Sequence, residues 1–196
     1  MNRKRTTAVL ILVIATIVTA AVAFRIGVDP PVANVAGSFG AIAALLIVSK
    51  ILDMRDDLFY SGIIFVFFAS PVGSVLDMYR SFGPYDKIIH FISGVLLASL
   101  GVFIISKLLK QAEMSCENKK VCTLMQAAFA FFFSSACAGI WEIFEFTADR
   151  IAGGGMQRGM VDTLTDMIAG NMGALLYCVI FVISAYMYKN NMRDLQ

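Results

Sequence analysis

The sequence contains few of the charged residues that a soluble domain carries on its surface. Only 15% of its 196 residues are charged, whereas 59% are hydrophobic. This composition excludes a soluble domain built around one core and is typical of a polytopic membrane protein. The formal net charge of +2 is too small to indicate a nucleic-acid partner. The hydrophobic composition instead predicts that the protein lies in the lipid bilayer.

Residues that form disulfides or nitrogen-ligand metal sites are also scarce. The spacing of the four cysteines argues against a disulfide framework or a zinc knuckle; they are Cys116, Cys122, Cys137 and Cys178. There is a single histidine, His90, which excludes a metal site built from several imidazoles. No serine or cysteine lies in a recognisable nucleophile motif.

Long apolar runs separated by short polar segments take up most of the chain. Six of them are long enough to cross a bilayer, at about 7–24, 32–52, 58–76, 87–108, 122–147 and 164–188. The first run follows basic residues, as the apolar region of a signal peptide also does. We expect an uncleaved span instead, because 18 helical residues reach roughly 27 Å, which is close to the thickness of the hydrocarbon layer. Pro71 and Gly73 predict a kink late in the third span. The sequence therefore predicts an all-α protein with a single six-helix transmembrane domain over residues 1–196.

The basic residues are distributed unevenly over the connections between these spans. With six spans, 11 of the 16 lysines and arginines fall on the side of the termini and 5 on the other side. Short loops rich in lysine and arginine stay in the cytoplasm. Both termini are therefore predicted to be cytoplasmic.

Acidic residues gather at the predicted extracytoplasmic ends of the last three spans. Span four begins with Asp86 and His90, and span six begins with Asp162 and Asp166. Each pair has the i, i+4 spacing that places two side chains on one helix face. Span five ends with three more acids that share one face, Glu142, Glu145 and Asp149. This topology predicts that all seven residues meet at one membrane surface.

Some of these acids have simple structural explanations. Asp86 and Asp162, each taken alone, suit the N-terminus of a helix, and Asp149 suits the membrane interface. Glu142 and Glu145 are harder to explain, because they lie among apolar residues near a helix C-terminus, where the helix dipole disfavours negative charge. A cation of the protein, a bound proton or a divalent metal ion must compensate them.

For a metal site, we expect His90, Glu142 and Glu145 as the ligands. Carboxylate oxygens suit magnesium, calcium or manganese, and an imidazole adds zinc, iron or nickel to the range. If the protein is an enzyme, Asp162 or Asp166 would act as the general base. Asp86 and Asp149 would complete the polar surroundings.

Three motifs carry a resemblance to a known family. They are DKIIHF at 86–91, WEIFE at 141–145 and DTLTDMIAGNMGA at 162–174. The chain from about Asp77 onward resembles the bacterial inner-membrane family typified by YjdF. It is more distantly similar to the VanZ-like membrane proteins, some of which are associated with glycopeptide resistance.

The resemblance implies a multi-pass protein of the bacterial inner membrane. The residues that carry the resemblance would include the polar cluster and would add Asn171 to it. The VanZ-like pattern maps onto Asp86, Lys87, His90, Glu142 or Glu145, Asp166, Asn171 and Gly173. The resemblance implies a fold and a polar site, without an established reaction.

Three functional interpretations remain open at this stage. The first is a metal-assisted hydrolase or transferase acting on a lipid-linked envelope substrate. The second is a cation- or proton-coupled transporter, for which six spans would call for a dimer or an internal repeat. The third is a non-catalytic assembly protein in which the polar cluster fixes helix register.

Overall fold

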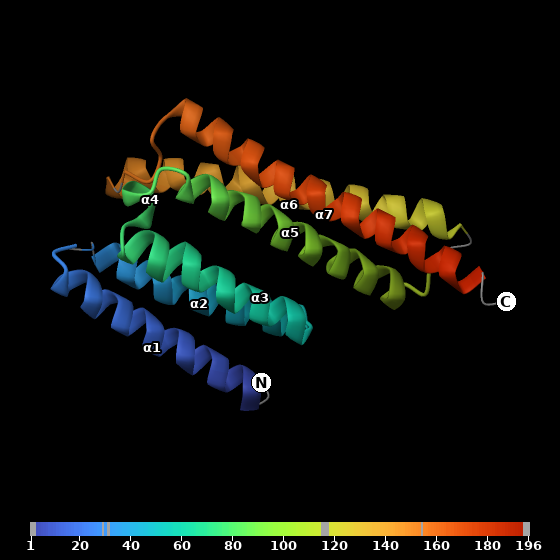
Figure 1. Ribbon diagram of the computed structural model, residues 1–196, viewed down its shortest axis with the longest axis horizontal. Coiled ribbons are helices and arrows are strands. Elements are labelled where there is room, and N and C mark those ends of the chain that lie inside the picture. The colour runs from blue at the N-terminus through green and yellow to red at the C-terminus, as the bar shows by residue number, and fades with distance from the viewer. Residues whose placement is uncertain (1–2, 29, 31, 115–117, 154, 194–196) are drawn as a thin grey trace. The chain divides into compact units, whose positions relative to one another are not determined.

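All regular elements that the structure describes are helices (Figure 1). The computed structural model describes residues 3–28, 30, 32–114, 118–153 and 155–193. The elements are α1 (Arg3–Arg25), α2 (Val32–Ile51), α3 (Asp56–Phe67), the π-helical segment η1 (Phe68–Val75), α4 (Met78–Ser81), α5 (Tyr85–Gln111), α6 (Lys119–Ala152) and α7 (Met160–Arg193). The prediction of an all-helical fold is confirmed.

Within the described residues, six helical segments are long and apolar enough to cross a membrane. They are Arg3–Arg25, Val32–Ile51, Asp56–Val75, Tyr85–Gln111, Lys119–Ile151 and Met160–Met187. The predicted number of spans is therefore confirmed. Several helices are longer than the predicted apolar runs. A helix can continue through polar residues once it has left the hydrocarbon layer, so an apolar run marks only the part of the helix that lies within that layer.

The chain divides into two units, Met1–Ile89 and His90–Gln196. In the first unit, α1, α2 and α3 pack against one another around Leu12, Ile42 and Val66. Two polar contacts join α2 to η1: Asn34 donates to the carbonyl of Ser74 at 2.9 Å, and the hydroxyls of Ser38 and Ser70 lie 2.8 Å apart.

The third span changes from α-helix to π-helix around Pro71. Proline has no N–H group, so the α-helical hydrogen bond to the carbonyl four residues earlier cannot form. Two tyrosine hydroxyls bind carbonyls at the start of the segment: Tyr79 donates to Ala69 at 2.9 Å and Tyr85 donates to Phe68 at 2.7 Å. The expected kink at Pro71 and Gly73 thus corresponds to a π-helical segment.

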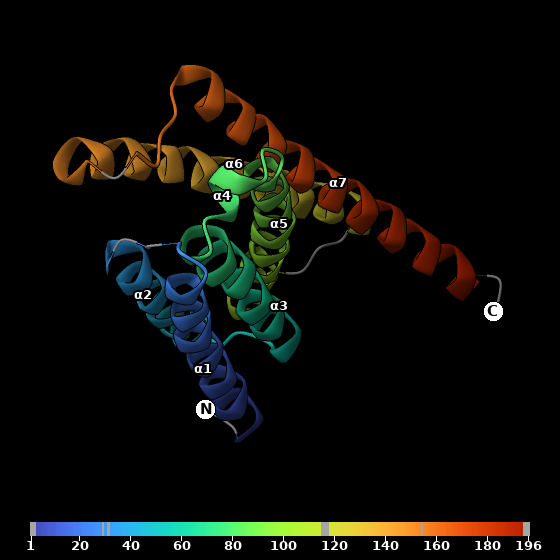
Figure 2. The ribbon, with the colours of Figure 1, turned by 60° about the vertical axis from the view of Figure 1, so that its left-hand side comes forward.

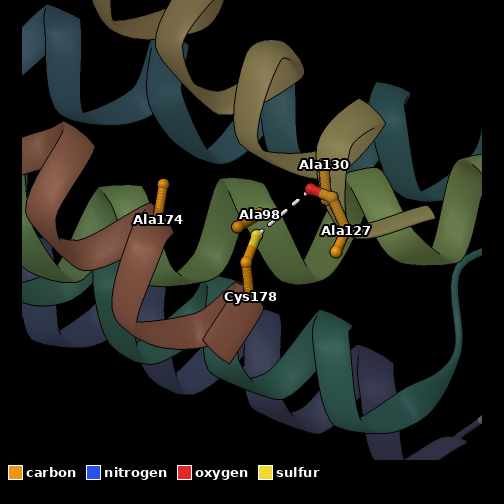
Figure 3. Packing of buried hydrophobic residues seen from close by; sticks show 5 residues of the cluster. All are labelled: Ala98, Ala127, Ala130, Ala174 and Cys178. Atoms are coloured by element: carbon orange, nitrogen blue, oxygen red, sulfur yellow. Dashed lines mark hydrogen bonds between the residues drawn. The ribbon is translucent and has the colours of Figure 1, made fainter. Parts of the chain in front are cut away.

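The second unit contains α6, α7 and nearly all of α5. Helices α6 and α7 pack side by side, which both views show (Figures 1 and 2). Its core consists of small residues from three helices (Figure 3): Ala98, Ala127, Ala130, Ala174 and Cys178. The Cys178 thiol donates to the carbonyl of Ala127 at 3.3 Å. Small side chains let helix backbones approach closely, which is the usual basis of helix packing in membranes.

The cysteines have different states. Cys137 and Cys178 are free, whereas Cys122 is disulfide-bonded. The spacing of the cysteines along the chain did not predict this bond. Cys116 lies outside the described residues.

Candidate functional site

Helix α5 presents two polar residues and a glycine on one face near its N-terminus. Asp86 lies in the first turn, and His90 and Gly94 follow at intervals of four residues. Residues at this spacing lie above one another on a helix. The carboxylate of Asp86 also suits the positive end of the helix dipole. The continuous helix therefore fixes Asp86 one turn before His90.

Helix α7 repeats the same pattern. Asp162 lies in its first turn, followed at the same interval by Asp166 and then by Gly170. Asp166 is only 1% exposed, whereas the side chain of Asp162 is 18% exposed. The second acid of the stripe is thus the one that faces the protein interior.

Glycines bring the two stripes together. A Cβ atom on Gly94 would collide with the backbone carbonyl of Gly170, and one on Gly173 would collide with the carbonyl of Phe91. The buried Ser134 of α6 donates to the carbonyl of Gly94 at 3.2 Å, so a third helix joins the contact. Only glycine allows backbones to approach this closely. The backbones of α5 and α7 therefore touch one turn away from His90 and Asp166.

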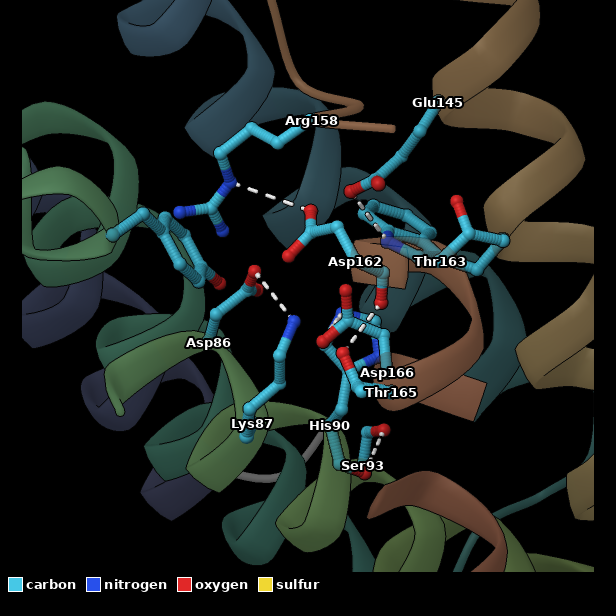
Figure 4. A network of polar contacts seen from close by, with 12 residues as sticks. Asp86, Lys87, His90, Ser93, Glu145, Arg158, Asp162, Thr163, Thr165 and Asp166 are labelled. Carbon is cyan, nitrogen blue, oxygen red and sulfur yellow. Dashed lines mark hydrogen bonds and ion pairs between the residues drawn. The ribbon is translucent and has the colours of Figure 1, made fainter. Parts of the chain in front are cut away.

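The contact assembles a group of three buried residues, Asp86, His90 and Asp166 (Figure 4). Nε2 of His90 lies 3.8 Å from Oδ1 of Asp166, and one ligand atom from each of the three residues lies within 4.8 Å of the others. Two ligands at about 2.1 Å from one tetrahedral metal ion are about 3.4 Å apart. Small side-chain rotations would therefore allow the three atoms to bind one ion.

A further carboxylate, that of Glu142 on α6, lies beside this group. Glu142 is only 5% exposed, and its Oε1 atom has no hydrogen-bond partner among the described residues. Thr163 forms a hydrogen bond with the same side chain, and His90, Asp166 and Asp162 are near enough to interact with it electrostatically. An unpartnered buried carboxylate oxygen is costly, so either a bound proton or a bound ligand must compensate it.

Two cations border the acidic residues. Nζ of Lys87 lies 3.7 Å from Oδ2 of Asp86, and Nε of Arg158 lies 3.3 Å from Oδ2 of Asp162 (Figure 4). Their side chains are 33% and 41% exposed, so both remain in partial contact with the surroundings. The cations therefore lie at the rim, and the least exposed acids lie further inside.

Two other acids named by the sequence have partners of their own. Glu145 accepts a hydrogen bond from Nε1 of Trp141 at 2.9 Å, on the same helix. Asp149 accepts from the backbone N–H groups of Met156 and Gln157 at 2.9 and 2.7 Å. Asp149 therefore organises the connection between α6 and α7.

The last residue of the predicted polar cluster lies in a separate contact. The hydroxyl of Ser135 on α6 donates to the side-chain oxygen of Asn171 on α7. The structure thus brings together Asp86, His90, Asp166 and Glu142, and it does not join Asn171 to their ligand atoms.

Sequence reasoning missed the residues that hold the site in place. Gly94 and Gly170 were not recognised, and neither was Thr163 as the donor to Glu142. A signal was present, because each glycine continues an i, i+4 stripe by one more turn. For Thr163 no comparable pattern existed.

Comparison with known proteins places the chain in a family. The curated proteins gave no significant match, and neither did the solved structures. Residues 6–187 match the sequence model of a family described as "predicted membrane protein (DUF2238)". Because this match covers almost the whole chain, the protein belongs to the DUF2238 family of predicted membrane proteins.

Proposed function

We propose that this protein binds a divalent metal ion through Asp86, His90 and Asp166 and uses it for hydrolysis or group transfer at the membrane surface. One observation carries the proposal. Three buried side chains converge from two helices with the donor types of a metal site, and the unpartnered oxygen of Glu142 lies beside them. Helix capping accounts for a carboxylate at the position of Asp86, but it does not account for His90, Asp166 or Glu142, which lie beyond the first turns of their helices.

The balance of charge supports a cation in this place. Four carboxylates, those of Asp86, Glu142, Asp162 and Asp166, accompany two cations, Lys87 and Arg158. With a neutral His90, one divalent ion would balance this set. Burying an uncompensated carboxylate costs several kcal/mol, whereas coordination offsets that cost directly.

The ligand types favour a hard or borderline ion. Carboxylates suit Mg²⁺, Mn²⁺ and Ca²⁺, and the imidazole extends the range to Zn²⁺ and Fe²⁺. Three protein ligands leave a coordination position for water or substrate, which is the usual arrangement of catalytic rather than structural metal sites.

Glu142 is suited to the role of general base. It contributes no atom to the three-residue group, but it lies close enough to interact electrostatically with His90 and Asp166. A free carboxylate oxygen beside a metal-bound water can accept the proton of that water. The substrate would be lipid-linked, because the site lies near the ends of helices able to cross a membrane.

We further propose a bacterial inner-membrane location with both termini in the cytoplasm. The excess of lysine and arginine in the loops on the side of the termini supports this orientation, whereas the disulfide-bonded Cys122 lies on the same side and disulfides are rare in the cytoplasm. The resemblance of the three motifs to YjdF and the VanZ-like proteins supports the location. In this orientation the site faces the outer leaflet.

Metal content tests the proposal most directly. We expect the purified protein to bind about one equivalent of Mn²⁺ or Zn²⁺. His90→Ala and Asp166→Asn should each lose this ion while keeping the helical content of the parent. Asn171→Ala is the matched control, because it removes a polar group from α7, the helix of Asp166, and Asn171 binds Ser135 rather than any of the three ligands. Equal metal binding by all four proteins would refute the proposal.

Cation transport is a second candidate function. It is favoured by the position of the buried acids within segments that are able to span a membrane, where ionisable residues often mark ion pathways. Uptake of Mn²⁺ into proteoliposomes would distinguish the two. Flux that is lost with Asp166→Asn would favour transport, whereas binding without flux would favour catalysis.

A further inference from the structure

Lys87 lies between two of the three proposed ligands in the sequence and pairs with one of them in space. Its Nζ atom is 3.7 Å from Oδ2 of Asp86 (Figure 4). The side chain of Asp86 is 10% exposed, whereas that of Lys87 is 33% exposed. The ammonium group thus approaches a nearly buried carboxylate from the rim of the site.

A divalent ion and this ammonium group compete for the same carboxylate. If a metal ion binds Asp86, two positive centres lie within a few ångströms of each other in a poorly screened place. Lysine has a flexible four-carbon stem and a strongly hydrated head, so it can swing toward the rim at little cost. Metal binding should therefore displace Lys87 from Asp86.

The displaced ammonium group would still lie next to the metal ion, since its backbone is fixed in the first turn of α5. A cation beside a metal ion is a common arrangement for holding a phosphate group, whose oxygens bind both. Phosphate esters are also a common chemistry of lipid-linked molecules at a membrane surface. The two cations would then share one anionic ligand.

We propose that Lys87 exchanges Asp86 for a phosphate group when the metal ion binds, so that the substrate is a phosphate ester and binds after the metal. This inference rests on the proposed metal site. In the metal-free protein, Lys87 is the counter-ion of Asp86. In the metal-loaded protein, it is a substrate-binding residue.

The exchange predicts opposite effects of one substitution on two ligands. With the full-length protein in detergent, Lys87→Met should tighten Mn²⁺ binding by about tenfold, because a competing charge is gone. The same change should weaken binding of inorganic phosphate to the Mn²⁺-loaded protein by about tenfold. Lys87→Arg keeps the positive charge, so it should change both affinities less than the neutral variants do, although its guanidinium group binds carboxylate and phosphate with a different geometry. Lys87→Gln serves as a second neutral variant if Lys87→Met does not fold.

The outcomes separate this inference from the metal site itself. If the parent binds Mn²⁺ and the neutral variants bind it equally well or more weakly, the exchange is refuted and the metal site stands. Tighter Mn²⁺ binding with unchanged phosphate binding also refutes the exchange. If neither the parent nor the neutral variants bind Mn²⁺, both proposals fail.

The source of the phosphate group is decided by a second comparison. Phosphatidic acid in mixed micelles should compete with inorganic phosphate more strongly than glycerol 3-phosphate does if the ligand is a lipid phosphate. Equal competition by the two compounds would indicate a free phosphate ester. Phosphatidylcholine is the control for the lipid surface, because its phosphate is a diester that carries a choline group. It should not compete, and competition as strong as that of phosphatidic acid would mean that the lipid surface, not the phosphate group, displaces inorganic phosphate, which would refute the phosphate site.

Discussion

Gly94 of α5 and Gly170 of α7 lie backbone against backbone, and a Cβ atom on Gly94 would collide with the carbonyl of Gly170. One turn earlier on the same helices lie His90 and Asp166, whose Nε2 and Oδ1 atoms are 3.8 Å apart. Because a helix is stiff over one turn, the glycine contact sets the distance between the two polar side chains. The packing of two helices and the geometry of the candidate metal site are thus one feature.

Substitution of Gly94 should damage both the fold and the site. Gly94→Ala should lower the free energy of unfolding by about 1–3 kcal/mol, since the backbones must separate to admit a methyl group. It should also weaken Mn²⁺ binding, because His90 and Asp166 move apart. Denaturant unfolding and Mn²⁺ titration measure the two effects.

Gly37 on α2 offers the matched control. A Cβ atom there has no neighbour within 4 Å, so Gly37→Ala should be neutral or stabilising by about 0.5–1 kcal/mol. If both alanine variants behaved alike, the close contact at Gly94 would have no energetic importance.

The membrane-crossing helices could be predicted from the sequence because lipid imposes strict conditions. A spanning segment must be apolar over about 20 residues and must satisfy its own backbone hydrogen bonds, so six long apolar runs indicate six helices. The ends were less predictable. Lys119 and Arg150 belong to α6, although their charges suggested the connections beside it.

The residues of the site could be named from the sequence, but their grouping could not. Periodicity shows which side chains share a face of one helix, and Asp86 with His90 and Asp162 with Asp166 follow from it. It does not show how a helix is rotated toward its neighbours. Because of that rotation, Glu142 is buried, whereas Glu145 forms a hydrogen bond with Trp141 on its own helix. The rotation of α5 likewise places Asp86 beside His90 and Asp166.

Glu142 and Glu145 should respond differently to the loss of their charge. Glu142→Gln removes a buried charge near two other acids, so it should stabilise the metal-free protein by about 1–2 kcal/mol. Glu145→Gln keeps an acceptor for the indole of Trp141 and should change stability by less than about 0.5 kcal/mol. Thermal unfolding after treatment with a chelator compares the two variants. A destabilised Glu142→Gln protein would mean that its charge is already compensated.

Asn171 should act in helix packing rather than in metal binding. The side chains of Ser135 and Asn171 join α6 to α7, and hydrogen bonds of this kind in membranes contribute about 0.5–1.5 kcal/mol. Ser135→Ala and Asn171→Ala should therefore be non-additive in a double-mutant cycle, with Mn²⁺ affinity unchanged throughout. Loss of Mn²⁺ binding in Asn171→Ala would instead assign this residue to the metal site.

The orientation of the protein can be tested at the connection between α6 and α7. Met156 is 40% exposed and its N–H group is bound by Asp149, so a cysteine there is accessible and held in a defined loop. In whole cells, Met156→Cys should react with a membrane-impermeant maleimide above the level of the parent protein. Arg55→Cys, at an exposed residue between α2 and α3, should react only after the cells are permeabilised. The reverse pattern would place the acidic cluster on the cytoplasmic side, and a substrate at the inner leaflet would replace the envelope substrate proposed above.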